Sequence, residues 1–276
     1  MKDGLRSTCS TAAENSLISI AKIAAELLTE HASARRDNRF AETHGIGDLV
    51  AAYEAQDAFV DRLLENERTT VTGYKLGLTS VGMQKMSGIT HPVAGVVLAN
   101  TVFKSPHRLT DITFSRLAIE FEVVVRLKHD LCGPGLIDIE TVAAAADGVA
   151  PAIELVDVRN ADLAAIDCLS LVAQNAWGTG LVLGQFQRSW PDLSSIVGCV
   201  TLNGEPIDEG TGSMALGYPF ASVAWLANHF IARGKTLKAG SIVSTGNIAK
   251  VRFPVAGQSY RFILEGLGDV AIDIQV

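Results

Sequence analysis

Ala-Ile-Glu-Phe-Glu-Val-Val-Val-Arg-Leu, residues 118–127, has the strongest strand pattern of the chain. Its β-branched and aromatic residues favour an extended backbone. Glu120 and Glu122 stand two residues apart within it, a spacing that places both side chains on one face of a strand, roughly 7 Å apart. On a buried face two carboxylates must be protonated or bind a cation, whereas on a solvated face they need neither. The pattern alone leaves both interpretations open.

A third carboxylate, Glu154, interrupts another apolar run at residues 151–160. Three carboxylates on hydrophobic strands are suited to a hard divalent cation such as Mg²⁺, which prefers oxygen ligands. The six histidines form no spaced pair with these glutamates, which disfavours zinc. Asp157 and Arg159 follow on the same strand, and we expect them to form a structural ion pair.

Lys75 lies within a further strand-like run at residues 71–78 and is followed by Gly77. A glycine at this place lets a ligand approach the backbone closely. Beside a metal or a substrate carboxylate, Lys75 would supply positive charge or a proton. The alternative is a surface lysine that extends into solvent.

The arrangement of predicted elements indicates an α+β fold with two parts. Residues 1–70 carry helical periodicity over 17–28 and 48–64, with Asp48 as a helix cap and a polar segment at 31–39 that we expect to be a surface loop. Residues 71–276 consist mainly of short β-rich runs separated by Gly, Pro, Asn and Asp, with one clear helix at 222–233. Strands that dominate without regular βαβ alternation predict a mixed, curved or barrel-like sheet.

Composition excludes several classes of protein. The net charge of −7 and pI of about 5.4 disfavour nucleic-acid binding, which needs clustered Lys and Arg. No run approaches the roughly 18 apolar residues of a membrane helix, and the first residues lack the apolar centre of a secretory signal. The four cysteines form no CxxC pair, so we expect reduced thiols. A cytoplasmic enzyme with no nucleic-acid or membrane partner is the expectation.

Several motifs together resemble one family. They are Gly-Tyr-Lys-Leu-Gly-Leu-Thr-Ser at 73–80, the Glu-x-Glu pair, the third Glu about thirty residues on, Leu-Gly-Tyr-Pro at 216–219, Ser-Thr-Gly at 244–246 and Gly-Leu-Gly-Asp-Val at 266–270. In this order they are similar to the 2-oxo-acid hydratase and decarboxylase family of aromatic meta-cleavage pathways, the 2-keto-4-pentenoate hydratase and 4-oxalocrotonate decarboxylase type. That family is a branch of the fumarylacetoacetase-like fold. The resemblance implies that residues 71–276 form a catalytic domain built on a curved β-roll, in a homo-oligomer.

The resemblance also implies a site. Glu120, Glu122 and Glu154 would hold Mg²⁺ (or Mn²⁺), which the 2-oxo and carboxylate groups of a small 2-oxo acid would chelate. Lys75 would be the catalytic residue beside them. The positions implied to bind substrate are Gly77, Leu78, Gln174 and Thr245.

Two departures from the family pattern bear on the reaction. Pro-Val-Ala-Gly at 92–95 stands where hydratases carry Pro-Asp-x-Gly, so that Val93 replaces a candidate acid/base. Ala-Gln-Asn-Ala-Trp at 173–177 stands where the family has Ala-Asp-Asn-Ala-Ser, which makes Gln174 unable to ionise and makes Trp177 bulky. Trp177, like Trp190 and Trp225, is expected in core or oligomer contacts.

These departures favour decarboxylation of a 4-oxalocrotonate-like substrate, with hydration of a 2-hydroxypenta-2,4-dienoate as the alternative. Decarboxylation needs chiefly an electron sink, whereas hydration needs a group that steers water and protons. Two further interpretations stay open. An acylpyruvate-type C–C hydrolase would need a His–Glu pair, which His44 and His91 do not obviously supply, and a non-catalytic family member would bind metal without turnover.

Overall fold

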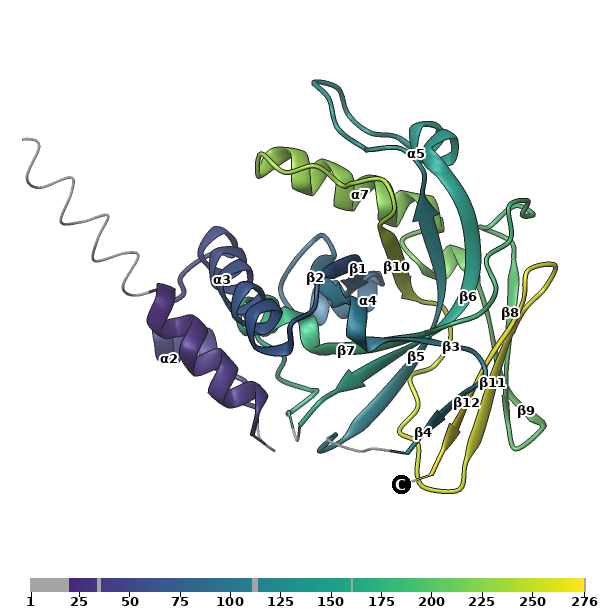
Figure 1. Ribbon diagram of the computed structural model, residues 1–276, viewed down its shortest axis with the longest axis horizontal. Helices are drawn as coiled ribbons and strands as arrows, with labels where there is room; N and C mark the ends of the chain where they lie inside the picture. The colour runs from purple at the N-terminus through teal and green to yellow at the C-terminus, as the bar shows by residue number, and fades with distance from the viewer. Residues whose placement is uncertain (1–19, 34–35, 111–113, 160, 276) are drawn as a thin grey trace, which may run out of the picture.

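The computed structural model describes residues 20–33, 36–110, 114–159 and 161–275. Two mixed β-sheets and a layer of helices make up this part of the chain (Figure 1). The beginning of the helix expected at 17–28 lies outside the described residues, and within them the chain is helical from 20 to 31. None of the described helices is both long and apolar enough to span a bilayer.

The larger sheet has seven strands and is strongly curved. In spatial order they are β2 (Val93–Leu98), β1 (Val71–Gly77), β10 (Ile242–Asn247), β5 (Leu117–Leu127), β6 (Ala146–Asp157), β7 (Gly178–Leu183) and β3 (Val102–Lys104). β2 and β3 remain the edges of this sheet, so it curls without closing into a barrel. The expected α+β fold with a mixed, curved sheet is confirmed.

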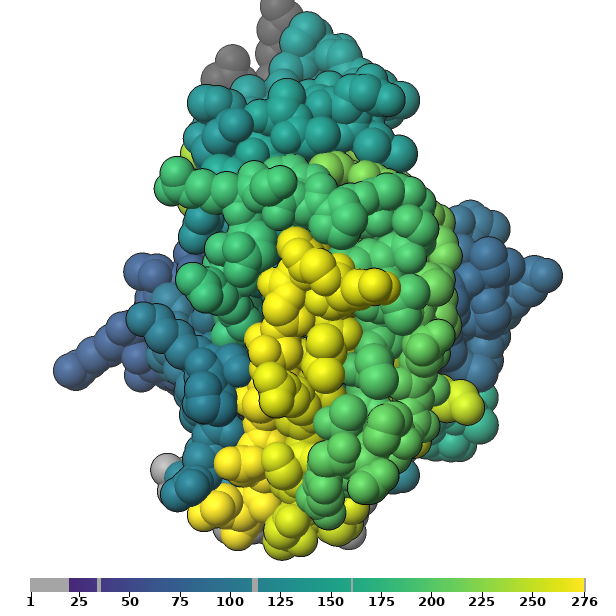
Figure 2. Space-filling view, turned by 90° about the vertical axis from the view of Figure 1, so that its right-hand side faces the viewer, coloured from purple at the N-terminus to yellow at the C-terminus, as the bar shows by residue number. Residues whose placement is uncertain are grey.

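The smaller sheet packs on the back of the larger one. Its order is β4 (His107–Leu109), β12 (Gly268–Ile274), β11 (Ser259–Leu264), β8 (Val197–Leu202) and β9 (Glu205–Thr211). Figure 2 shows its outer side, with the yellow C-terminal strands between the green β8–β9 pair and the blue-green β4 segment. Phe121 of β5 and Phe262 of β11 are fully buried between the sheets, with ring centroids 5.5 Å apart. This contact removes the rear face of the central strands from water.

Helices cover the other side of the curved sheet. The helices are α2 (Phe40–His44), α3 (Leu49–Glu67), α4 (Val81–Met86), α5 (Ile139–Ala145), α6 (Cys168–Ala173) and α7 (Pro219–Ala232), with short 3₁₀ turns η1 (Ala99–Thr101), η2 (Asn175–Trp177) and η3 (Gly212–Met214). Asp48 caps α3 as expected, accepting a hydrogen bond from Ala51 N at 2.9 Å. The helix expected at 222–233 begins three residues earlier because Pro219 is suited to the first turn. One continuous apolar core runs from Ile23 in the N-terminal helix to Ile274 in the last strand.

Glycine permits the close approach of β1 to β10, the two strands that carry Lys75 and Ser244. A Cβ on Gly73 would lie 2.2 Å from the carbonyl oxygen of Ile242, its partner in the parallel pair. No Cβ fits at that distance, so the two backbones would have to separate. The position of Lys75 therefore depends on Gly73.

We predict that Gly73→Ala lowers the free energy of unfolding by roughly 2 kcal/mol or more, because overpacking against backbone cannot be relieved by a rotamer change. Gly82→Ala is the matched control, since a Cβ there meets nothing within 4 Å. Urea denaturation followed by circular dichroism measures both. Equal stability of the two variants would show that the β1–β10 contact tolerates the extra carbon.

Candidate active site

Three carboxylates converge on one face of the central strands. Glu120 of β5 lies directly opposite Glu154 of β6, and Glu122 follows two residues further along β5. One oxygen from each carboxylate lies within 4.8 Å of the other two. Glu122 and Glu154 are buried and Glu120 is half-buried, so water does not separate the three charges.

The hydrogen bonds to this cluster are incomplete. Glu122 Oε2 accepts hydrogen bonds from Ser244 Oγ and from Gly246 N, the latter at 2.8 Å. Within the described residues, Glu122 Oε1 and Glu154 Oε2 accept none, and Glu154 Oε1 has only the ammonium of Lys75 beside it. A buried carboxylate oxygen without a donor is strongly unfavourable, so the cluster calls for a cation or for protons.

Burial and mutual repulsion act on the protonation of these groups. Burial, then the neighbouring Glu154 carboxylate, raises the pKa of Glu120 to about 7. The same causes, in the same order, raise the pKa of Glu122 well above its ordinary value. The carboxyl groups of Glu120 and Glu122 thus resist ionisation unless positive charge is added. A hard divalent cation with oxygen ligands fits this donor set.

Lys75 supplies one positive charge to the cluster. Its Nζ lies 3.2 Å from Glu154 Oε1, and both side chains are buried. Burial alone would lower the pKa of Lys75, but the charges of Glu154, Glu120 and Glu122 outweigh it and raise that pKa. Lys75 is therefore a buried ammonium held by carboxylates, and not a lysine that extends into solvent.

The backbone of Gly178 closes the cluster from the side of β7. A Cβ on Gly178 would lie 3.2 Å from Glu154 Oε1 and 3.3 Å from Lys75 Cε. The φ angle of this residue is −66°, which any amino acid adopts, so only space requires glycine here. The missing side chain lets Glu154 and Lys75 take their positions.

A cavity of about 520 Å³ opens over the cluster. Lys75 and Glu120 line its inner end, together with Gly77 and Leu78 of the motif that follows Lys75. Most of the remaining lining side chains are apolar. The structure thus brings together the three glutamates, Lys75, Gly77 and Leu78.

Two residues expected to bind substrate do not line the cavity over Lys75 and Glu120. Gln174 faces the N-terminal helix, where its Nε2 donates to Glu30 Oε1 at 2.9 Å and to the Asp37 carbonyl at 2.9 Å. Thr245 is fully buried, and its hydroxyl donates to the carbonyl of Val123 at 2.8 Å. Gln174 instead lines a second cavity of about 650 Å³ together with Glu154. Ser244, the preceding residue, contacts Glu122 instead, because side chains alternate along β10.

Trp177 is buried in the apolar core, which confirms the expectation of a core contact. It lines the cavity, together with Ala176. Asn175, Ala176 and Trp177 have φ values of 55°, 49° and 58°, a left-handed turn that costs roughly 1–2 kcal/mol per residue. Asn175 stabilises this turn by bonding both the N–H and the carbonyl of Val96 through its side-chain amide. The sequence signal for its place at the cavity was that Trp177 stands where the family pattern has a small serine.

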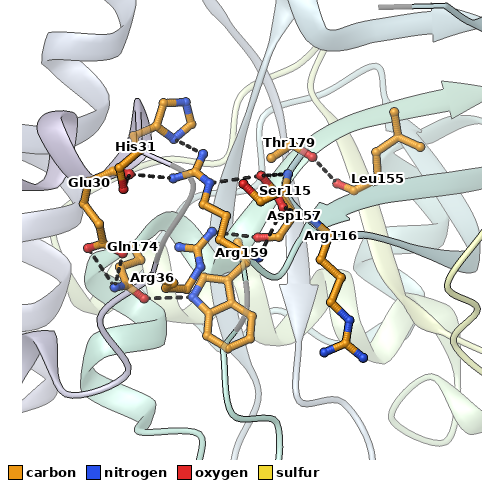
Figure 3. A network of polar contacts seen from close by, with 12 residues as sticks. Glu30, His31, Arg36, Ser115, Arg116, Leu155, Asp157, Arg159, Gln174 and Thr179 are labelled. Carbon is orange, nitrogen blue, oxygen red and sulfur yellow. Dashed lines mark hydrogen bonds and ion pairs between the residues drawn. The ribbon is translucent and has the colours of Figure 1, made fainter. Parts of the chain in front are cut away.

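A buried polar network lies behind this turn (Figure 3). Arg159 Nε lies 3.0 Å from Asp157 Oδ2, which confirms the expected ion pair. Arg159 Nη2 lies 3.0 Å from His31 Nδ1, and Arg36 Nη2 donates to the Asp157 carbonyl at 2.8 Å. The expectation of a surface loop at 31–39 is wrong for His31 and Arg36, because these contacts tie them to the end of β6. Distant partners of this kind leave no local pattern in the sequence.

The histidines do not form a catalytic pair at the site. His44 Nδ1 lies 2.9 Å from Glu26 Oε2 in the N-terminal helices, and His91 bonds the Pro92 carbonyl. Neither lines the cavity. Val93 is fully buried and pairs with Gly77 across β1 and β2, so that no carboxylate stands at that position beside the cavity.

A curved mixed sheet that carries three clustered carboxylates and a buried lysine defines a class of α+β proteins with a site suited to a divalent metal. The profile described as "Fumarylacetoacetate (FAA) hydrolase C-terminal" matches residues 75–275, and the chain belongs to this family. The expected family resemblance is thereby confirmed.

Similar proteins include both types named from the sequence. A 2-keto-4-pentenoate hydratase of Burkholderia vietnamiensis is 32% identical, over 91% of this chain and 96% of its own length. A 4-oxalocrotonate decarboxylase of Pseudomonas putida is also 32% identical, over 77% of this chain and 80% of its own. The solved 4-oxalocrotonate decarboxylase from Pseudomonas putida G7, complexed with magnesium and adipate, superposes with a TM-score of 0.85 at 27% identity. That match covers 92% of this chain and 97% of the solved one.

We predict that Gly178→Ala weakens Mg²⁺ binding by about tenfold or more, since a methyl group there displaces Glu154 and Lys75 from their positions. Calorimetric titration of metal-free protein measures the affinity. Gly47→Ala is the control, because a Cβ at Gly47 meets nothing within 4 Å. Unchanged affinity in Gly178→Ala would mean that the cluster does not depend on this contact.

The polar network predicts a loss of stability in mild acid. Burial, then the charge of Arg159, lowers the pKa of His31 to about 4 from 6.5 in the unfolded chain. Between these values the unfolded state takes up the proton first, so stability falls as the pH falls from 6.5 towards 4. In His31→Gln this fall becomes shallower, because an amide oxygen can accept from Arg159 without titrating.

Urea denaturation midpoints at pH 7 and pH 5 measure the effect. His129→Gln serves as the control, since His129 is exposed. If His31→Gln keeps the full wild-type difference between the two pH values, the titrating group lies elsewhere.

Proposed function

We propose that the chain is a divalent-metal-dependent lyase that acts on a small 2-oxo-enoate or its 2-hydroxydienoate tautomer. The observation that carries this proposal is the cluster of three converging carboxylates, some of whose buried oxygens accept no hydrogen bond, beside a buried lysine. Lys75 and Glu120 line one cavity, and Glu154 lines the second one. The similarity to both hydratases and decarboxylases supports it. Within the chain, residues 71–276 would form the catalytic unit and residues 1–70 would close one side of it.

Glu120, Glu122 and Glu154 would hold Mg²⁺ (or Mn²⁺). A divalent ion held there acts as a Lewis acid towards the 2-oxo group and stabilises negative charge that develops on its oxygen. Ser244 and Gly246 orient the Glu122 carboxylate by bonding one of its oxygens, which leaves the other oxygen free for a ligand. Fixed ligand orientation of this kind raises metal affinity.

Lys75 would act on the substrate at the same end of the cavity. Its ammonium is fixed by Glu154 at 3.2 Å and lines the cavity. It can attract the substrate carboxylate, and it can hold or release a proton at Nζ when the dienolate is protonated or formed. The apolar side chains beyond it exclude water, which strengthens these electrostatic interactions.

Two reactions use this arrangement, and each has an observation in its favour. Decarboxylation of a 4-oxalocrotonate-like acid is favoured by Val93, because no acid/base carboxylate stands beside Gly77 to steer water. Hydration of a 2-hydroxypenta-2,4-dienoate is favoured by Lys75, a titratable group that lines the cavity and could handle the proton in place of the missing Asp. Both reactions pass through the same stabilised dienolate.

We predict that metal-free protein is inactive and that Mg²⁺ restores turnover of 2-oxo-3-hexenedioate or of 2-hydroxypenta-2,4-dienoate. Release of CO₂ from the first and loss of dienoate absorbance from the second are measured in parallel. Glu122→Gln removes a negative ligand without changing size, and should reduce both Mg²⁺ affinity and turnover by about tenfold or more.

Glu205→Gln is the control, since Glu205 is exposed at the start of β9. CO₂ release identifies a carboxy-lyase, and dienoate consumption alone identifies a hydro-lyase. Mg²⁺ binding without turnover of either compound would contradict the lyase proposal and favour a non-catalytic member of the family.

A further inference from the structure

The far part of the cavity lacks charge. Among the described residues that line it, Lys75 is the only Lys, Arg or His and Glu120 is the only acid, and both belong to the inner end. Most of the other lining residues are aliphatic or aromatic, among them Val156, Val158, Leu163, Ile166 and Leu171, and the polar ones are the uncharged Thr79, Ser80 and Asn247. A carboxylate placed here would lose its water without gaining a cation.

Trp177 forms a rigid part of this wall. Its Nε1 donates to Gln174 Oε1 at 2.8 Å, and Gln174 is in turn fixed by the Glu30 carboxylate. The guanidinium carbon of Arg36 lies 4.9 Å from the centre of the indole ring. Figure 3 shows Gln174, Arg36 and Arg159 as members of one network behind the turn. The indole is therefore held in place before any ligand binds.

The nearby arginines do not supply the missing cation. Arg159 is paired with Asp157, and Arg36 lies close enough to Glu30 and Asp157 to interact with both charges. Both arginines line the second cavity of about 650 Å³, which Glu154 and Trp177 also line, and not the one over Lys75. Arg116 lies over the ring of Phe253, with its guanidinium carbon 4.5 Å from the ring centre, and does not line the cavity either.

The rim of the cavity continues the apolar surface outward. Met83, Met86, Met214 and Phe253 line it and are between 37% and 49% exposed. Methionine side chains are flexible and adapt to apolar groups of different shape. A substrate tail longer than the cavity would therefore still meet apolar side chains.

We propose that this cavity selects 2-oxo acids whose far end is an uncharged alkyl or aryl group, with Trp177 as the specificity-determining wall. This inference rests on the proposed function, because it assumes that the carboxylates and Lys75 hold the 2-oxo acid head. Within that function it favours hydration of a dienoate with an apolar tail, since loss of CO₂ from the far end requires a second carboxylate there.

The test compares three saturated 2-oxo acids that share the head group. Pyruvate has no tail, and 2-oxooctanoate and 2-oxooctanedioate have chains of equal length that differ in one terminal carboxylate. Calorimetry measures their affinity for the Mg²⁺-loaded protein. We expect 2-oxooctanoate to bind at least about tenfold more tightly than either of the others, because each buried methylene contributes roughly fourfold.

The outcomes distinguish failure of the apolar-tail inference from failure of the proposed function. If all three acids bind equally, or if the dicarboxylate binds more tightly, the apolar-tail inference is overturned and the head-group site stands. If none binds although Mg²⁺ does, the proposed function fails and this inference fails with it.

Two variants locate the tail. Val251→Arg brings a cation to the rim, where Val251 is 40% exposed, and should reduce the preference for 2-oxooctanoate over the dicarboxylate by about tenfold. Val255→Arg is its control, because Val255 is 59% exposed and does not line the cavity.

Binding of 2-oxooctanoate should also change tryptophan fluorescence in the wild type but not in Trp177→Phe, since Trp190 and Trp225 line no part of the cavity. A fluorescence change that persists in Trp177→Phe, or an equal effect of both arginine variants, would contradict the placement.

Discussion

Three carboxylates packed within 4.8 Å of one another, with little access to water, are the constraint on which the rest of this structure depends. Their mutual repulsion is unfavourable in a protein interior unless positive charge balances it. Lys75 provides one such charge, and the oxygens that accept no hydrogen bond leave room for a divalent cation to provide more. A site that attracts a cation strongly in this way is also a site that can stabilise a developing oxyanion.

The fold meets this constraint through the order of its strands. β1, β10, β5 and β6 are consecutive neighbours in the curved sheet, so Lys75, the Ser244–Gly246 segment of β10 and the three glutamates come together from four strands. The smaller sheet seals the rear of β5 and β6 through contacts such as Phe121 with Phe262. Positions with no side chain, Gly73 and Gly178, allow the approach of backbones and charged groups that this convergence requires.

Much of this arrangement could be predicted from the sequence because it depends on local periodicity. The two-residue spacing of Glu120 and Glu122 fixed their common face, and the apolar runs around Glu154 and Lys75 indicated buried strands. The sequence could not predict which way the Gln174 side chain points, nor that Trp177 lines a cavity. Both depend on a left-handed turn at 175–177 and on contacts with Glu30 and Arg36, which are distant in the sequence. Thr245 was misplaced by one residue of strand alternation, and its neighbour Ser244 has the contact with the cluster.

We expect Glu120, Glu122 and Glu154 to hold one divalent cation between them. The most direct measurement is a titration of metal-free protein with Mn²⁺, followed by electron paramagnetic resonance of the free ion. We expect one bound Mn²⁺ per chain, displaced by Mg²⁺ and lost in Glu154→Gln while the variant keeps its fold. Binding of Mn²⁺ that is equal in wild type and Glu154→Gln, or no binding at millimolar metal, would contradict it.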